Sequence, residues 1–195
     1  MPKIPTEVIW FQSCLVGVIV RPMSELSFST AGEQDISTVV DILSDATQHK
    51  LRHGDKIWGE ESWFDHEVRD DMGESTVYLI KQGDEVIATV AMQWDDERNW
   101  DVQPPVAGYI HRLAVKDGYH GQGLGAQIVD WAKSQVAAQG RQYLRLDCEA
   151  ANRELCGYYE KLGFTQVGTR PVPEYGDYVA ALFEQSVVAQ EGSTV

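Results

Sequence analysis

A glycine-rich segment between a predicted strand and a predicted helix constrains the fold of this chain more than any other feature. The segment runs from Leu113 to Ala126 and reads LAVKDGYHGQGLGA, with four glycines among the eight residues 118–125. Closely spaced glycines let the backbone bend so that successive N–H groups point into one concavity, and the first turn of the following helix adds further unpaired N–H donors. We therefore expect this turn to bind a phosphate or pyrophosphate group without help from Lys or Arg.

The overall charge limits the partners of such a site. The chain has 195 residues, with 16 Lys and Arg against 30 Asp and Glu, which gives a formal net charge of −14. A nucleic-acid backbone needs a basic face, so no nucleic-acid partner is expected, and the acidic total instead favours the approach of a cationic substrate. The apolar run 8–20 is shorter than the roughly 20 residues that cross a bilayer, so no membrane partner is expected either.

Two common nucleotide-binding loops do not match the glycine-rich segment. A Walker loop needs Gly-Lys-Ser/Thr at its end, whereas Gly125 is followed by Ala126 and Gln127. A dinucleotide fingerprint needs G-x-G-x-x-G close to the first strand, whereas the glycines at 121, 123 and 125 give G-x-G-x-G late in the chain. The segment is therefore either another class of phosphate-binding turn or a plain glycine-rich turn, and four glycines placed between a strand and a helix favour the former.

Apolar residues at alternating and at helical spacing divide the chain into strands and helices. The predicted strands cover residues 26–30, 76–81, 85–94, 107–115, 143–148, 164–168 and 178–184. The predicted helices cover residues 36–53, 60–72, 126–138 and 152–162, and residues 95–105 are predicted as a loop. This order fits one α/β (α+β) domain in which a mixed sheet of six to seven strands carries helices on both faces.

The domain is predicted to span residues 24–187, with an apolar extension before it (1–23) and a tail after it (188–195). Met23 is followed by the polar start Ser24-Glu25, which is typical of a natural chain beginning. One interpretation makes the extension an upstream or engineered leader without a role in function. The other makes it an added strand or helix that covers an apolar patch on this or a neighbouring subunit.

The cysteines favour a reducing compartment. The chain has an odd number of cysteines, Cys14, Cys148 and Cys156, and they lack the paired spacing of a zinc ribbon. Neither a disulfide scaffold nor a zinc ribbon is therefore expected. We therefore predict a cytoplasmic protein in which Cys148 and Cys156 pack as small apolar side chains.

Two motifs resemble those of the GNAT N-acetyltransferases. The segment His120-Gly-Gln-Gly-Leu-Gly125 is similar to the family's pyrophosphate loop, Arg/Gln-x-x-Gly-x-Gly/Ala, and departs from it at His120. The family's closing pattern, a strand followed by Asn and then Tyr-Glu-x-x-Gly-Phe, matches the strand at 144–148, Asn152 and the segment 159–164. The two matches have the family's order and spacing, and the resemblance spans roughly residues 26–186.

The resemblance implies a fold and a co-substrate. In this family the central sheet splays between the strand ending near Val115 and the strand ending near Cys148, and acetyl-CoA lies in the gap, with its pantetheine arm bonded to the backbone of the first strand. The residues that the resemblance assigns to the cofactor are Leu113, Ala114, Val115, His120, Gly121, Gln122, Gly123, Leu124, Gly125, Ala126, Asn152 and Tyr159. No metal is implied.

The implied reaction is direct attack of an amine on the acetyl thioester. The amine must lose its proton first, because an ammonium ion has no lone pair, and the departing thiolate gains from a proton donor. Tyr159 matches the family's usual donor, and Asn152 either contacts the cofactor or caps a helix. Three residues compete for the role of base, Asp147, His111 and Glu149, and a water relay is a further alternative.

The acceptor side is less defined by the sequence. The tryptophans at 58, 63, 94 and 100 are expected to divide between the core and an aromatic-walled acceptor pocket, where Asp95, Asp96, Glu97 or Asp101 attracts a cation. The expected acceptor is a small-molecule or peptide amine, and a homodimer is compatible with the resemblance. His49 and His53 have a spacing that metals use, but the sequence shows no third ligand, so they are interpreted as surface residues.

Two alternative functions remain open at this point. A non-catalytic acyl-CoA sensor would share the glycine-rich loop but would need no base and no proton donor. An acyltransferase with a longer acyl donor would share all the motifs.

Overall fold

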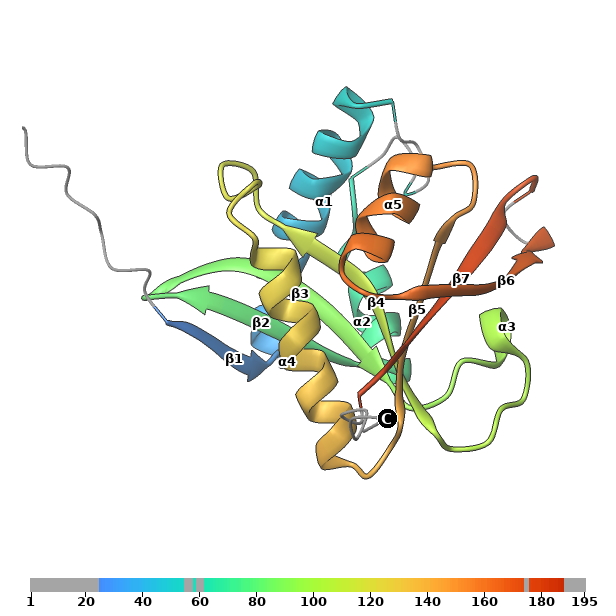
Figure 1. Cartoon of the computed structure of the whole chain (residues 1–195). Helices are drawn as coiled ribbons and strands as arrows, with labels where there is room; N and C mark the ends of the chain where they lie inside the picture. The colour runs from blue at the N-terminus through green and yellow to red at the C-terminus, as the bar shows by residue number, and fades with distance from the viewer. Residues whose placement is uncertain (1–24, 55–57, 59–61, 174–175, 188–195) are drawn as a thin grey trace, which may run out of the picture.

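The computed structural model describes residues 25–54, 58, 62–173 and 176–187. Within them the chain forms a seven-stranded mixed sheet (Figure 1). The strands, in chain order, are β1 (Leu26–Thr30), β2 (Thr76–Gln82), β3 (Glu85–Gln93), β4 (Ala107–Val115), β5 (Tyr143–Glu149), β6 (Thr165–Pro171) and β7 (Val179–Ser186). They lie in the order β1-β2-β3-β4-β5-β7-β6, and β4 and β5 form the parallel pair in an otherwise antiparallel sheet.

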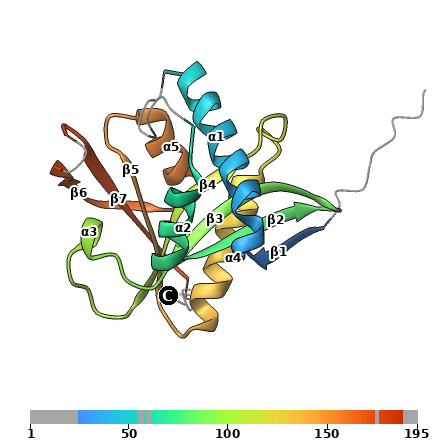
Figure 2. The same ribbon diagram turned by 180° about the vertical axis from the view of Figure 1, so that it is seen from behind.

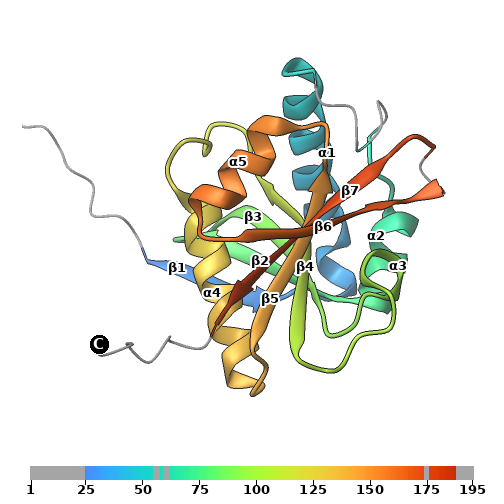
Figure 3. The ribbon, with the colours of Figure 1, turned by 45° about the vertical axis from the view of Figure 1, so that its right-hand side comes forward.

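Helices cover both faces of the sheet. They are α1 (Ile36–Arg52), α2 (Asp65–Glu74), α3 (Glu97–Trp100), α4 (Leu124–Ala138) and α5 (Arg153–Lys161), with a short 3-10 turn at Glu33–Asp35. Helices α1 and α2 lie on one face, as seen in Figure 2, and α4 and α5 lie on the other. The apolar sides of both pairs pack against the sheet. Figure 3 shows the sheet between these two pairs of helices, so the predicted fold class is confirmed.

The centre of the sheet opens as predicted. Strands β4 and β5 pair at Ala107, Gly108 and Tyr109 only, and they diverge toward their carboxyl ends. Gly108 lies where the strands are still together, and a Cβ atom there would come within 2.6 Å of Val136 Cγ2 on α4 and 2.9 Å of the Trp94 ring. A side chain at this position would therefore push α4 away from the closed end of the sheet.

A β-bulge interrupts β4 at the open end. Thr89 pairs with Ala114 and Ala91 pairs with His111, so Arg112 and Leu113 together face a single residue of β3. Arg112 has a φ of 49°, which is uncommon for a residue with a side chain. Because of the extra residue, the Leu113 side chain lies on the face of the sheet that α4 covers. Strict alternation from His111 would place it on the face that α1 covers.

The predicted order of elements is confirmed, with differences at the boundaries. Residues 95–105 were expected to be a loop but contain α3, because the Asp96 side chain accepts a hydrogen bond from the Asn99 N–H at 3.2 Å and caps the turn. Helix α2 begins at Asp65 rather than at residue 60, with the Glu67 carboxylate accepting a 2.8 Å hydrogen bond from the Phe64 N–H. The predicted extension 1–23 and tail 188–195 lie outside the described residues.

Candidate active site

A cleft of about 1210 Å³ lies where β4 and β5 part. Its walls come from α1, α2, α5 and the start of α3, together with the diverging ends of the two strands. Single small-molecule pockets are usually about 300–1,000 Å³, so this cleft has room for a cofactor arm and an acceptor together. No described helix has the length and apolar character of a membrane span.

The glycine-rich loop has the backbone shape that a phosphate site needs. Gly118, Gly121 and Gly123 have φ values of 84°, 75° and 73°. Gly123 is the N-cap residue of α4, so no side chain caps the first N–H groups of that helix. The first N–H groups of α4, from Leu124 onward, have no partner within the helix. The hydroxyl of Tyr158 stands over this turn, 2.3 Å from where a Cβ atom on Gly125 would lie.

The residues predicted to contact the cofactor gather in two adjoining places. Leu113, Ala114, Val115, His120, Asn152 and Tyr159 line the cleft. Residues 121–126 continue from His120 as the rest of the loop and the first turn of α4. Asn152 caps α5, because its side chain accepts a 3.0 Å hydrogen bond from the Leu155 N–H.

The two leading candidates for the base form one group in the cleft. His111 on β4 lies between two carboxylates, with Nδ1 3.7 Å from Asp147 Oδ1 and Nε2 3.4 Å from Asp96 Oδ2. The hydroxyl of Tyr178 donates a 3.2 Å hydrogen bond to Asp147 Oδ2. Buried polar atoms are rarely left unpaired, yet His111 Nε2 and Asp147 Oδ1 are buried without a hydrogen-bond partner. Glu149 also lines the cleft, two residues farther along β5.

Burial and neighbouring charge move the two carboxylates in opposite directions. Burial raises the pKa of Asp147, an effect that the adjacent His111 only partly offsets. Burial also acts on Asp96, but there His111 and the Asn99 amides prevail and lower the pKa. Asp147 is therefore the more basic of the two carboxylates.

Tyr159 occupies a largely apolar position on α5. Its ring packs against Phe164 and Phe183, with centroids 5.9 and 5.8 Å away. Burial raises the pKa of its hydroxyl, so the phenol stays protonated at neutral pH. A protonated hydroxyl at the cleft has the chemistry of a proton donor.

Trp58 and Trp63 line the cleft, and Trp94 and Trp100 do not. Trp58 and Trp63 meet edge to face, and the Trp63 Nε1–H donates a 3.0 Å hydrogen bond to the Thr47 hydroxyl. Trp94 packs over Gly108 and Trp100 packs against Tyr109, so these two tryptophans have packing roles and the other two lie at the cleft.

Acidic side chains outnumber basic ones around the cleft. The acidic residues that line it are Glu67, Asp70, Asp71, Glu74, Asp95, Asp96, Glu97, Asp147 and Glu149. Asp101, which was expected among them, instead pairs with Arg170 at 2.6 Å.

The acidic residues of α2 were missed by the sequence reasoning, although four of them within residues 67–74 were a visible signal. Asp71 pairs with Arg112 at 2.7 Å, and burial nevertheless raises its pKa to about 6.

The two described cysteines are packed in the protein interior. Cys148 on β5 and Cys156 on α5 are free and buried, with their sulfur atoms 3.7 Å apart. Burial raises the pKa of the Cys148 thiol, which disfavours a thiolate nucleophile and agrees with the expectation that both side chains pack in the core.

Comparison with known proteins agrees with this geometry. An uncharacterised N-acetyltransferase of Bacillus subtilis, YesJ, is 28% identical over 130 residues, which cover 64% of this chain and 69% of that protein. A GNAT-family acetyltransferase structure from Listeria monocytogenes superposes with a TM-score of 0.67 at 19% identity, covering 83% of this chain and 94% of that one. An aminoglycoside acetyltransferase in complex with coenzyme A superposes with a TM-score of 0.65 at 17% identity, covering 83% and 95%.

The family model for GNAT acetyltransferases matches residues 38–164, which include the bulged strand, the glycine-rich loop and the Asn152–Tyr159 segment. This chain belongs to the GNAT acetyltransferase family.

Proposed function

We propose that this protein transfers the acetyl group of acetyl-CoA to a primary amine of a small molecule or peptide. The observation that carries the proposal is the buried Asp147 oxygen without a hydrogen-bond partner, which lies beside His111 in the same cleft as Tyr159. A sensor that only binds acyl-CoA would have no use for a carboxylate oxygen left without a hydrogen bond at this position. An acetyltransferase needs one, because the attacking amine must lose a proton.

Asp147 is the proposed base. Its raised pKa makes it a better proton acceptor than an exposed carboxylate, and Tyr178 orients it by holding the other oxygen. His111 lies within 3.7 Å and is the proposed partner that shares the proton. The amine nitrogen forms a bond to the acetyl carbon, and the bond from that carbon to the CoA sulfur breaks.

Tyr159 is the proposed acid for the departing thiolate. The thiolate leaves more easily when it receives a proton, and the Tyr159 phenol, which lines the cleft and is protonated at neutral pH, supplies one. In this scheme the backbone N–H groups from Gly121 to Ala126 hold the pyrophosphate of acetyl-CoA. The pantetheine arm lies along Leu113 to Val115, on the unpaired side of β4.

The acceptor is proposed to be cationic in solution. Helix α2 and the start of α3 present seven carboxylates to the cleft, and Trp58 and Trp63 supply aromatic surface beside them. A protonated amine is drawn into such a site by its charge and is retained over a neutral analogue. An acceptor with a second positive charge can keep that charge against α2 while its reacting amine loses a proton near Asp147.

A thiol-release assay tests the proposal. Purified protein is mixed with acetyl-CoA and a panel that pairs each amine with its neutral alcohol analogue. The proposal predicts amine-dependent release of free CoA that Asp147→Asn reduces strongly. Binding of acetyl-CoA without turnover on any amine would support the sensor, and faster turnover with a longer acyl-CoA would assign a different donor.

A further inference from the structure

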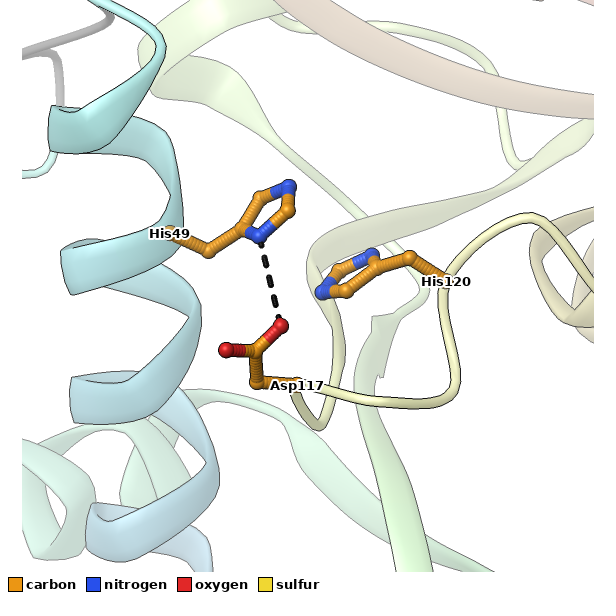
Figure 4. A group of neighbouring side chains, drawn as sticks. All are labelled: His49, Asp117 and His120. Atoms are coloured by element: carbon orange, nitrogen blue, oxygen red, sulfur yellow. Dashed lines mark ion pairs between the residues drawn. The ribbon is translucent and has the colours of Figure 1, made fainter.

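A second group of potential metal ligands lies at the mouth of the cleft, apart from His111. His49 on α1 faces Asp117 and His120, which belong to the loop between β4 and α4 (Figure 4). His49 Nδ1 lies 3.6 Å from Asp117 Oδ1, and the rings of His49 and His120 stack with centroids 3.9 Å apart. In the sequence His49 has a metal-type spacing only with His53, and no third ligand is evident. The fold instead brings Asp117 and His120, from another segment, next to His49.

The donor atoms are close to the spacing that a metal ion requires. One nitrogen from each imidazole and one Asp117 oxygen all lie within 4.8 Å of one another. Figure 4 shows these atoms turned toward the same small space. A tetrahedral zinc ion with bonds of about 2.0–2.1 Å holds its ligands about 3.3 Å apart, so the two imidazoles, now stacked at an interplanar angle of 15°, would rotate until both ring planes contain the ion.

Neighbouring groups orient the carboxylate for this role. Arg52 donates a 2.9 Å hydrogen bond to Asp117 Oδ2, and the Gly118 N–H donates to Oδ1 at 3.1 Å. Such contacts fix the direction of a ligating carboxylate. His53 lies beside His49, but its Nδ1 is 2.8 Å from the His49 carbonyl oxygen, so it is held by the backbone and lies outside the ligand group.

We propose that His49, Asp117 and His120 bind one divalent transition-metal ion of the zinc type. Two imidazole nitrogens and a carboxylate oxygen are ligands that zinc accepts, and three protein ligands leave a coordination position open. Asp117 and His120 are exposed, so an ion can enter from solvent. A bound ion would tie α1 to the start of the glycine-rich loop. The proposal does not depend on the acetyl-transfer activity.

Titration of the metal-free full-length chain with Co²⁺, followed by visible absorption, tests the proposal without CoA or an amine present. We expect saturable binding of one ion, with displacement by Zn²⁺. His49→Gln and His120→Gln should each weaken Co²⁺ binding at least tenfold, and Asp117→Asn should also weaken it. His66→Gln is the matched control, because His66 is an exposed histidine on α2 outside the ligand group.

A further variant separates this site from the other His and Asp cluster. His111→Gln removes a ligand of the Asp96–His111–Asp147 group and should leave Co²⁺ binding unchanged. Circular dichroism and the Tm of each variant establish that it is folded. The proposal is overturned if wild-type protein shows no saturable Co²⁺ binding, if folded His49→Gln and His120→Gln variants bind as well as wild type, or if His111→Gln alone abolishes binding.

Discussion

The hydroxyl of Tyr178 donates a hydrogen bond to one carboxylate oxygen of Asp147, and the other oxygen of Asp147 is buried without a hydrogen-bond partner. This asymmetry fixes the carboxylate in one orientation while leaving a proton acceptor in the cleft. That oxygen faces His111 Nδ1 at 3.7 Å, beyond hydrogen-bond distance, so it can still accept a proton from a group that enters the cleft.

Replacing Asp147 by Asn should lower kcat by about 10²- to 10⁴-fold, because the variant keeps the side-chain size but loses the base. The pKa of Asp147 is raised, and a base acts only when deprotonated, so wild-type activity should rise with pH through a limb above the usual Asp range. That limb should disappear in Asp147→Asn. If Glu149→Gln causes the larger loss of kcat and removes the limb, Glu149 is the base instead.

Replacing Tyr159 by Phe should also lower kcat by about 10²- to 10⁴-fold, with little change in stability. The ring contacts with Phe164 and Phe183 are kept, and only the hydroxyl, the proposed proton donor, is lost. Steady-state kinetics and urea unfolding measure the two effects separately. Tyr158→Phe serves as the neighbouring control, and an equal loss of kcat in both variants would argue against a specific role for the Tyr159 hydroxyl.

The spacing of apolar residues and glycines in the sequence was enough to predict most helices and strands and the glycine-rich loop. The turn from β4 into α4 depends on glycines that adopt positive φ, and the cap of α5 depends on Asn152, so both can be identified from a few adjacent residues. The start of α2 and the presence of α3 were missed. Each is fixed by a side-chain hydrogen bond to the backbone at the helix start, and the apolar spacing of the residues there does not reveal it.

The arrangement of the candidate site could not be predicted from the sequence. Asp147 and His111 were rivals for one role, and the structure brings them within 3.7 Å of each other because β4 and β5 are neighbours. Asp96 joins them only through the capped turn of α3, and Arg112 reaches Asp71 at the bulge in β4. These contacts depend on the packing of segments far apart in the chain, for which local periodicity carries no signal.

Asp71 should make the protein less stable as the pH rises from about 4 to about 7. Its pKa is about 6 when folded, chiefly because of burial, and 3.8 in the reference state, so the folded protein holds the proton over a range where the unfolded chain has released it. The stabilising contribution is complete below pH 3.8 and is lost as the pH passes through 6, a change of at most about 3 kcal/mol.

Urea unfolding of wild type and Asp71→Asn at several pH values measures this effect. The free energy of unfolding of wild type minus that of the variant should fall as the pH rises, because Asn cannot ionise. A constant difference would show that the ion pair with Arg112 offsets burial, and a difference that grows with pH would show that the ion pair outweighs burial.

Replacing Gly108 by Ala should destabilise the protein by about 1–3 kcal/mol, because the new methyl group would overlap Val136 on α4 and the Trp94 ring at the closed end of the sheet. Gly73→Ala is the matched control: a Cβ atom there meets nothing within 4 Å, and alanine in a helix is up to about 1 kcal/mol more favourable than glycine. Val136→Ala should partly restore the stability of Gly108→Ala, since it removes the Cγ2 atom that the methyl group meets. Equal stabilities of Gly108→Ala and wild type would mean that α4 can shift freely over β4. In that case the glycine-rich loop, which joins the two elements, would not be held in a fixed position relative to the cleft.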